Sequence, residues 1–126
     1  MTRIVKLVPR EGVALDVGRL ERLFARLGPA EGEAATLRAL AEIGRRCDKM
    51  QAAVMRGDRA AAAGQARALA RAAAPVGLTG IARAAEAAAR CAAVADGVAL
   101  AALAARIARL TLRAGAAVWD LEDISV

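Results

Sequence analysis

The chain lacks histidine and tyrosine entirely, and it contains one phenylalanine and one tryptophan in 126 residues. Histidine is the side chain that most often transfers protons near neutral pH, and it is also the commonest protein ligand of metal ions. Without it, catalysis would depend on scattered carboxylates or isolated thiols, and no two carboxylates form a recognisable catalytic pair. We therefore expect that the protein is not an enzyme and that it uses no cofactor.

Cysteine is also scarce. Cys47 and Cys91 are far apart in the sequence, and neither belongs to a CxxC pair. Since no histidine can join them, we expect no metal site. Both cysteines fall among apolar residues of expected helices, which predicts buried, reduced thiols.

Lysine is nearly absent, so the formal net charge of +6 comes almost entirely from arginine. Such a charge can indicate a nucleic-acid partner. The arginines, however, are spread over the whole chain without a dense block, and the chain has almost none of the aromatic side chains that stack on bases. We therefore expect no binding of nucleic acid.

Long apolar runs are missing as well. Arginines interrupt the alanine-rich stretches every few residues, so no span approaches the roughly 20 apolar residues that a membrane helix needs. Near the N-terminus, Lys6, Pro9 and Arg10 interrupt the apolar segment that a signal peptide would require. These features predict a cytoplasmic protein that does not bind membranes.

Alanine dominates what is present. Apolar residues make up 58% of the chain although aromatic residues make up only 2%. Alanine has the highest helix propensity, whereas the β-branched and aromatic residues that favour strands are sparse. The composition therefore predicts an all-α protein with closely packed helices, and its length fits a single domain over residues 1–126.

Turn and capping residues divide the chain into five expected helices. Asp16 is a good N-cap before an apolar stripe that ends at Gly28-Pro29, and Thr79 is expected to cap the fourth helix. Each later break contains a glycine, at Gly57, Gly77 and Gly97. The expected helices cover residues 17–27, 31–56, 60–74, 79–94 and a last stretch from 99 onward.

The connections between these helices are short, and short connections favour antiparallel neighbours. We predict an up-down antiparallel four-helix bundle preceded by a short N-terminal helix. Residues 1–14 are expected to form an N-terminal arm. Residues 119–126 contain acidic but no basic side chains, and we expect them to form an acidic C-terminal tail with a fraying end.

The third expected helix has an unusual outer side. A helical projection places Leu69 and its apolar neighbours toward the core, and it places Arg67 and Arg71 on the opposite side among small residues. A flat helix side with two projecting guanidinium groups suits close approach by a partner protein. Composition alone can also produce such a bare side in a chain this rich in alanine. The candidate docking face comprises Ala63, Gly64, Arg67, Ala70, Arg71 and Ala74.

The segment 15–110 resembles histidine-containing phosphotransfer (Hpt) domains. In that family a four-helix bundle carries the motif H-x-L-K-G, with another glycine six residues after the first. The stretch ARALARAAAPVGL, Ala66–Leu78, is similar to this motif at Leu69 and Gly77. The turn RGD at Arg56–Asp58 and the helix GLTGIARAAEAAAR resemble the family's elements on either side.

Three departures from the motif decide what the resemblance implies. Arg67 stands at the position of the phosphoacceptor histidine, Ala70 replaces the lysine, and Arg71 replaces the glycine. A guanidinium group stays protonated and offers no nucleophilic lone pair, so it cannot accept a phosphoryl group. Because the chain contains no histidine, it cannot carry phosphohistidine at any position.

Two functions remain as expectations. The resemblance implies a non-catalytic binding module, an adaptor or inhibitor, whose partner is the receiver domain of a response regulator or a histidine kinase. Arg67 and Arg71 would then pair with acidic groups of that partner. The alternative is a structural or oligomerising helical bundle, a homodimer that uses the small residues of the candidate docking face to pack against a second copy.

Overall fold

In the computed structural model, the backbone of residues 14–124 and the side chains of residues 14–115 are described. This part of the chain contains α-helices and no strands, which confirms the expected all-α class. The elements are α1 (Val17–Leu27), α2 (Pro29–Met55), α3 (Arg59–Ala73), a short 3-10 turn η1 (Ala74–Val76), α4 (Thr79–Ala93) and α5 (Gly97–Ile124).

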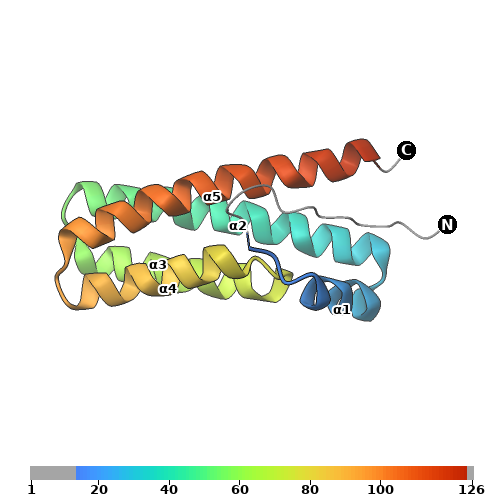
Figure 1. Ribbon diagram of the computed structural model, residues 1–126, viewed down its shortest axis with the longest axis horizontal. Coiled ribbons are helices and arrows are strands. Elements are labelled where there is room, and N and C mark those ends of the chain that lie inside the picture. Colours follow the sequence, from blue (N-terminus) through green and yellow to red (C-terminus); the bar gives the residue numbers. More distant parts are fainter. Residues whose placement is uncertain (1–13, 125–126) are drawn as a thin grey trace.

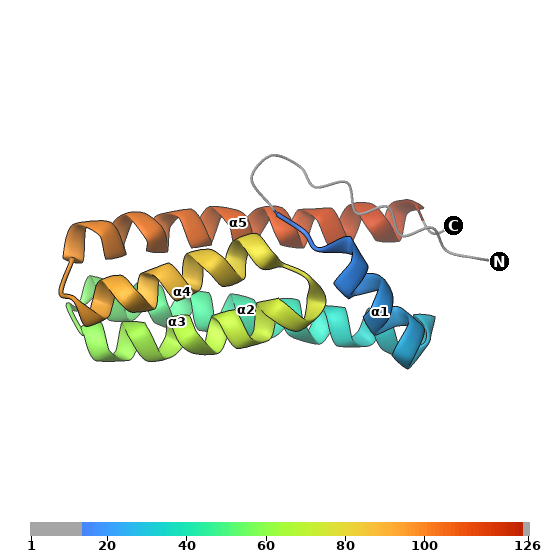
Figure 2. The same cartoon turned by 60° about the horizontal axis from the view of Figure 1, so that its bottom comes forward.

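The four longer helices lie side by side along the long axis of the molecule, and each runs opposite to the one before it (Figure 1). Helix α3 packs between α2 and α4, and α5 packs against both α4 and α2. Helix α1 lies at one end, where it contacts α2 and η1 (Figure 2). Each long helix is therefore buried on two sides and exposed on the other two.

Aspartate side chains cap the N-termini of three helices, α1, α3 and α5. Asp16, Asp58 and Asp96 each accept a hydrogen bond at 3.0 Å from the backbone N–H three residues later. Such bonds satisfy donors that the first helical turn leaves without a partner. The connection between the first two helices is shorter than predicted. Helix α2 begins at Pro29, whereas the second helix was expected to begin at residue 31.

The prediction that Thr79 caps α4 was wrong. Leu78 occupies the N-cap position, and α4 has no side-chain cap. The hydroxyl of Thr79 instead donates to the carbonyl of Ala14 at 3.2 Å. A contact with a residue so distant in the sequence therefore replaces the local cap.

The acidic C-terminal segment was also expected to be separate from the last helix, and its backbone is not. Helix α5 continues to Ile124, so residues 119–124 are helical. These residues contain neither glycine nor proline, and so nothing in them interrupts the helical hydrogen bonds. The last two residues, and all of the expected N-terminal arm except Ala14, lie outside the described residues.

The core consists of a few large side chains among many alanines. Helices α2, α3, α4 and α5 each bury at least one large side chain completely; these are Ile43, Met50, Leu69, Ile81 and Ile107. Most of the remaining buried residues are alanines. Because alanine side chains are short, the helix axes can approach at the close end of the usual range, about 8 Å.

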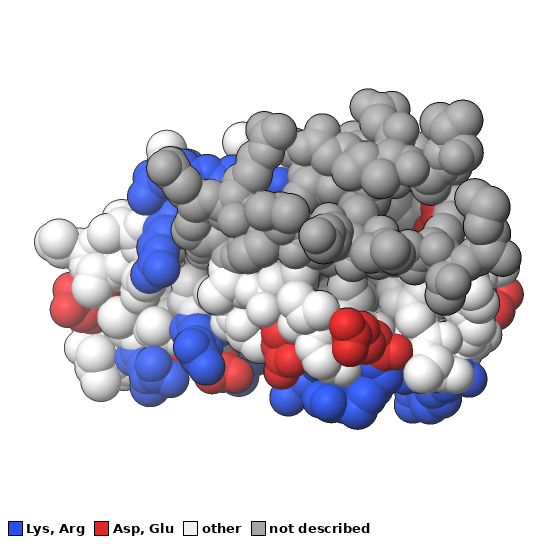
Figure 3. Space-filling model, turned by 45° about the vertical axis from the view of Figure 1, so that its right-hand side comes forward, with Lys and Arg blue, Asp and Glu red and all other residues white. Residues whose placement is uncertain are grey.

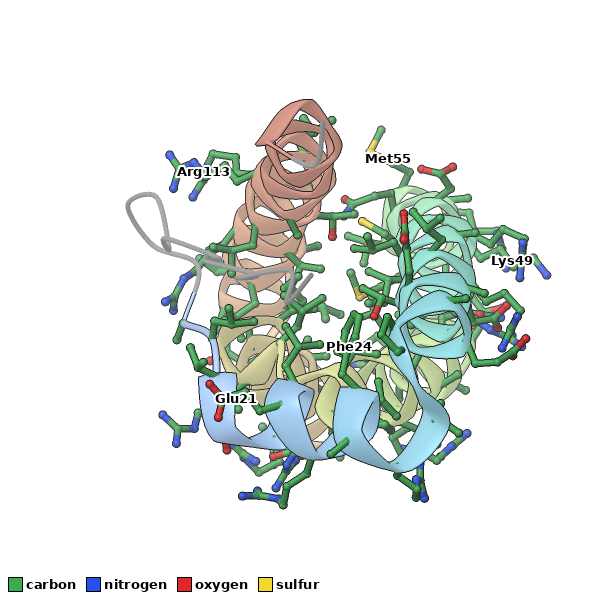
Figure 4. The ribbon with its side chains drawn as sticks, turned by 90° about the vertical axis from the view of Figure 1, so that its right-hand side faces the viewer. Glu21, Phe24, Lys49, Met55 and Arg113 are labelled. Carbon is green, nitrogen blue, oxygen red and sulfur yellow. The ribbon has the colours of Figure 1, made fainter. Side chains whose placement is uncertain are left out.

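Helix α1 is held against α2 by an aromatic ring that lies on a glycine. A Cβ atom added to Gly32 would come within 2.8 Å of the ring of Phe24. In Figure 4 this ring points from α1 toward the interior, next to α2. Gly28, which has a φ of 83°, provides the tight turn between the two helices.

The segment before α1 is tied to the connection between α3 and α4. The N–H of Asp16 donates to the carbonyl of Gly77 at 2.7 Å, and the N–H of Gly80 donates to the carbonyl of Ala14 at 3.1 Å. Gly77 has a φ of 78°, and a Cβ atom there would lie 2.5 Å from the carbonyl oxygen of Asp16. Only glycine fits this position without displacing the backbone.

We expect Gly77→Ala to lower the free energy of unfolding by about 2–4 kcal/mol, because it adds both left-handed backbone strain and a clash with backbone. The matched control is Gly44→Ala in α2, where a Cβ atom would meet nothing within 4 Å. That variant should gain about 0.5–1 kcal/mol from better helix propensity. Urea unfolding of both variants measures the difference, and equal effects would contradict the assigned role of Gly77.

Candidate docking surface

Arg67 and Arg71 lie one turn apart on α3, and both are exposed, as predicted. Among the residues whose side chains are described, neither arginine has an ion-pair partner. Their guanidinium groups therefore keep all their donors available for a partner molecule.

Two small residues of the candidate docking face are not on the surface. Ala63 and Ala70 are each only 7% exposed and belong to the core. The sequence projection assumed a single buried stripe, whereas α3 packs against two neighbours and so buries a wider arc. Gln65 contacts α2, and Ala63 and Ala70 lie on the other flank of the buried arc, where α4 packs.

The other small residues on this side of the chain, to which Ala60 at the start of α3 also belongs, remain accessible to different degrees. Ala60 is exposed, and Gly64 is half-buried with open space where its Cβ atom would be. Ala74 is also half-buried and lies in η1. We use the term exposed arginine surface for Ala60, Gly64, Arg67 and Arg71.

A third arginine lies at the end of this surface, and the sequence analysis did not identify it. Nη1 of Arg19, in α1, donates to the carbonyl oxygen of Ala74 at 3.1 Å. Its Nε atom lies 4.0 Å from a carboxylate oxygen of Asp16. Arg19 and Ala74 are 55 positions apart in the sequence, so no local sequence pattern could have indicated the contact between them.

Helix α4 adds charged side chains next to α3. Arg83, Glu86 and Arg90 are exposed, and they lie on the side of α4 opposite its buried stripe. Basic side chains, with acidic ones between them, occur along the lower edge of the molecule, which α1, α3 and α4 form (Figure 3). The surroundings of the exposed arginine surface are thus mixed in charge rather than uniformly basic.

Polar contacts with α2 fix the rotation of α3 about its axis. Nη1 of Arg46 donates to Oε1 of Gln65 at 3.2 Å, and Nε of the same arginine donates to Glu42 at 2.6 Å. Arg45 also donates to Glu42. Since Gln65 is held toward α2, Arg67 and Arg71 are directed away from the core.

Hydrogen bonds from Arg45 and then Arg46 hold the pKa of the Glu42 carboxyl below its ordinary value of 4.5, although desolvation acts in the opposite direction. A lowered pKa in the folded state means that the ionised carboxylate stabilises the fold. This stabilisation is present above the ordinary pKa, and it disappears as the pH falls through the lowered value.

We expect Glu42→Gln to lower the free energy of unfolding at pH 7 and to lower it less at pH 3, because the stabilisation by the ionised carboxylate begins to be lost once the pH falls below the ordinary pKa of 4.5. Urea unfolding at the two pH values measures this dependence. Glu86→Gln is the control, because Glu86 is exposed on α4 and forms no ion pair with any side chain of the described part. A loss that is the same at both pH values would contradict the role given to Glu42.

The remaining chemically active groups do not form a second site. Cys47 is buried and Cys91 is half-buried, and both are free thiols. Among residues 14–115, His, Cys, Asp and Glu side chains form no group of three or more that could hold a metal ion. Within the part of the chain that the structure describes, no helix has the length and apolar character needed to cross a membrane.

Comparison with known proteins identifies no relative of this chain. No protein-family model, no curated protein and no solved structure matches this chain.

Proposed function

We propose that the protein is a non-catalytic, Hpt-like binding module that docks the receiver domain of a response regulator. In this proposal α2 to α5 form the up-down four-helix bundle of the Hpt type, and α1 covers one end. The observation that carries the proposal is the placement of Arg67. It occupies the motif position of the phosphoacceptor, it is exposed on α3, and it has no ion-pair partner among the described side chains.

Binding rather than phosphoryl transfer follows from the chemistry of this side chain. The guanidinium group of Arg67 is protonated at all physiological pH values and has no lone pair for attack on phosphorus. It is, however, well suited to carboxylates and to phosphate, since its planar fork of N–H donors forms paired, charge-assisted hydrogen bonds. A module with this residue can hold an acidic partner without modifying it.

The acidic active site of a receiver domain is such a partner. Arg67 and Arg71 are one helical turn apart, which separates their Cβ atoms by about 6 Å, so both can reach one acidic cluster. Ala60 and Gly64 lie beside them and leave room for a partner helix or loop. By occupying the docking surface of a receiver, the protein would keep genuine phosphotransfer proteins from that receiver. This role places it in the cytoplasm.

The alternative, self-association through the candidate docking face, has less support. Two of its four small residues, Ala63 and Ala70, are buried within the chain and cannot contact a second copy. A histidine kinase remains the other signalling partner for the same arginines.

We expect Arg67→Glu to weaken receiver binding at least tenfold, because the substitution places a carboxylate against the acidic cluster of the receiver. Titration of the protein with receiver domains from the same genome, at two salt concentrations, measures this effect. The matched control is Arg106→Glu on α5, which has the same change in charge at an exposed position away from α3.

A second variant tests the flat shape of the surface separately from its charge. In Gly64→Leu, a large side chain would project next to both arginines, into space that is open in the wild type. Binding should weaken although helix propensity improves. Receiver affinity that is unchanged in Arg67→Glu, or absent for every receiver tested, would overturn the proposal.

A further inference from the structure

A third guanidinium group lies at the C-terminal end of α3, and it comes from another helix. Nη1 of Arg19 donates to the carbonyl oxygen of Ala74 at 3.1 Å. Ala74 follows Arg71 by three residues and keeps helical backbone angles. Residues at this spacing are neighbours on a helix surface, with Cβ atoms about 5–6 Å apart. Arg67, Arg71 and Arg19 therefore form a row that begins on α3 and crosses to α1.

Hydrogen bonds hold α1 in the orientation that this row requires. The N–H of Asp16 donates to the carbonyl of Gly77 at 2.7 Å, and the hydroxyl of Thr79 donates to the carbonyl of Ala14 at 3.2 Å. These bonds join the residues before α1 to the connection between α3 and α4. The start of α1, and Arg19 with it, is therefore fixed beside the end of α3.

Arg19 is held in place and still has donors for a partner molecule. The carbonyl of Ala74 takes one N–H of Nη1, and the nearest carboxylate oxygen of Asp16 is 4.0 Å from Nε, beyond hydrogen-bond distance. A guanidinium group has five N–H donors, and the side chain of Arg19 is 46% exposed. Because one edge of the group is already fixed, a contact through the other edge loses less conformational entropy.

The charges on α1 beside this row are mainly positive. A Cβ atom on Gly18 would lie 3.4 Å from Nη1 of Arg22, so the side chain of Arg22 folds back toward the start of α1. Glu21 lies two residues after Arg19, on nearly the opposite side of the helix, and it points upward from α1 in Figure 4. The carboxylate of Asp16 also caps α1. This balance of charge suits an acidic partner.

We propose that Arg19 is a third contact residue of the exposed arginine surface, which therefore takes an acidic partner face that extends beyond a single cluster. Seven residues separate Arg67 from Ala74, which is about 10 Å along a helix axis. In this arrangement Arg67 and Arg71 hold the acidic active site of a receiver domain, and Arg19 holds a further carboxylate beside it. The inference rests on the proposed function, because it adds a residue and a partner requirement to the same docking surface.

Arg19 also stabilises the end of α3, since a cation that bonds the last carbonyls of a helix is favourable there. The two roles make different predictions. A purely structural role predicts that loss of the side chain lowers stability and leaves the affinity for a partner unchanged. A contact role predicts that the affinity falls and that it depends less steeply on salt, because one charged contact is lost.

Titration of the full chain with receiver domains from the same genome, at two salt concentrations, tests the inference. We expect Arg19→Gln to weaken binding about three- to tenfold and to reduce its salt dependence. The matched control is Arg106→Gln, which removes the same charge from an exposed position of α5 and should leave the affinity nearly unchanged.

Thr79→Val separates the charge of Arg19 from the position of α1. It removes the hydroxyl bond to Ala14 and keeps Arg19, so stability should fall in urea unfolding while the affinity stays close to that of the wild type. Arg19→Gln and Thr79→Val each lose one exposed hydrogen bond, too small a loss to unfold the domain.

Two results would overturn the contact role of Arg19 and leave the proposed function standing. One is wild-type affinity in Arg19→Gln together with weak binding by Arg67→Glu. The other is an equal loss of affinity in Thr79→Val and Arg19→Gln, since a loosened α1 would then explain both. A wild-type chain that binds no receiver domain would overturn the inference and the proposed function together.

Discussion

The buried sides of α3 and α4, two helices that pack against each other, consist almost entirely of methyl groups. Five of the six buried residues of α3 are alanines, and so are six of the seven buried residues of α4. Alanine loses no side-chain rotamer entropy on burial, so this packing gains contact without that cost. It also forces the two helix axes close together, and at that spacing the rotation of each helix is restricted. The outward direction of Arg67 and Arg71 depends on this restriction together with the hydrogen bond that holds Gln65 toward α2.

Much of the helical framework was predictable from local chemistry. Aspartate caps, glycine breaks and proline at the first helical position act within a few residues, so the sequence alone placed α1 and the starts of α3 and α5 closely. The outward position of the two arginines was equally predictable, because long charged side chains are rarely buried without a partner.

Other features depended on contacts that no local pattern encodes. Alanine fits both buried and exposed helix positions, so its presence could not show that Ala63 and Ala70 face a neighbouring helix. Thr79 was predicted to be an N-cap, but its hydroxyl donates a hydrogen bond to the carbonyl of Ala14 instead. Arg19 lies beside the exposed arginine surface because it donates a hydrogen bond to the carbonyl of Ala74. These contacts connect α1 and the residues before it with the connection between α3 and α4, and only the tertiary fold brings these segments together.

The methyl-lined core has a further consequence for how stability varies with temperature. The heat-capacity change of unfolding grows with the apolar area that becomes exposed, and a buried alanine exposes much less than a buried leucine. The curve of free energy against temperature should therefore be flatter than is usual for a domain of this length. A fold built in this way retains a similar margin of stability over a wide range of temperatures, and cooling weakens it only slightly.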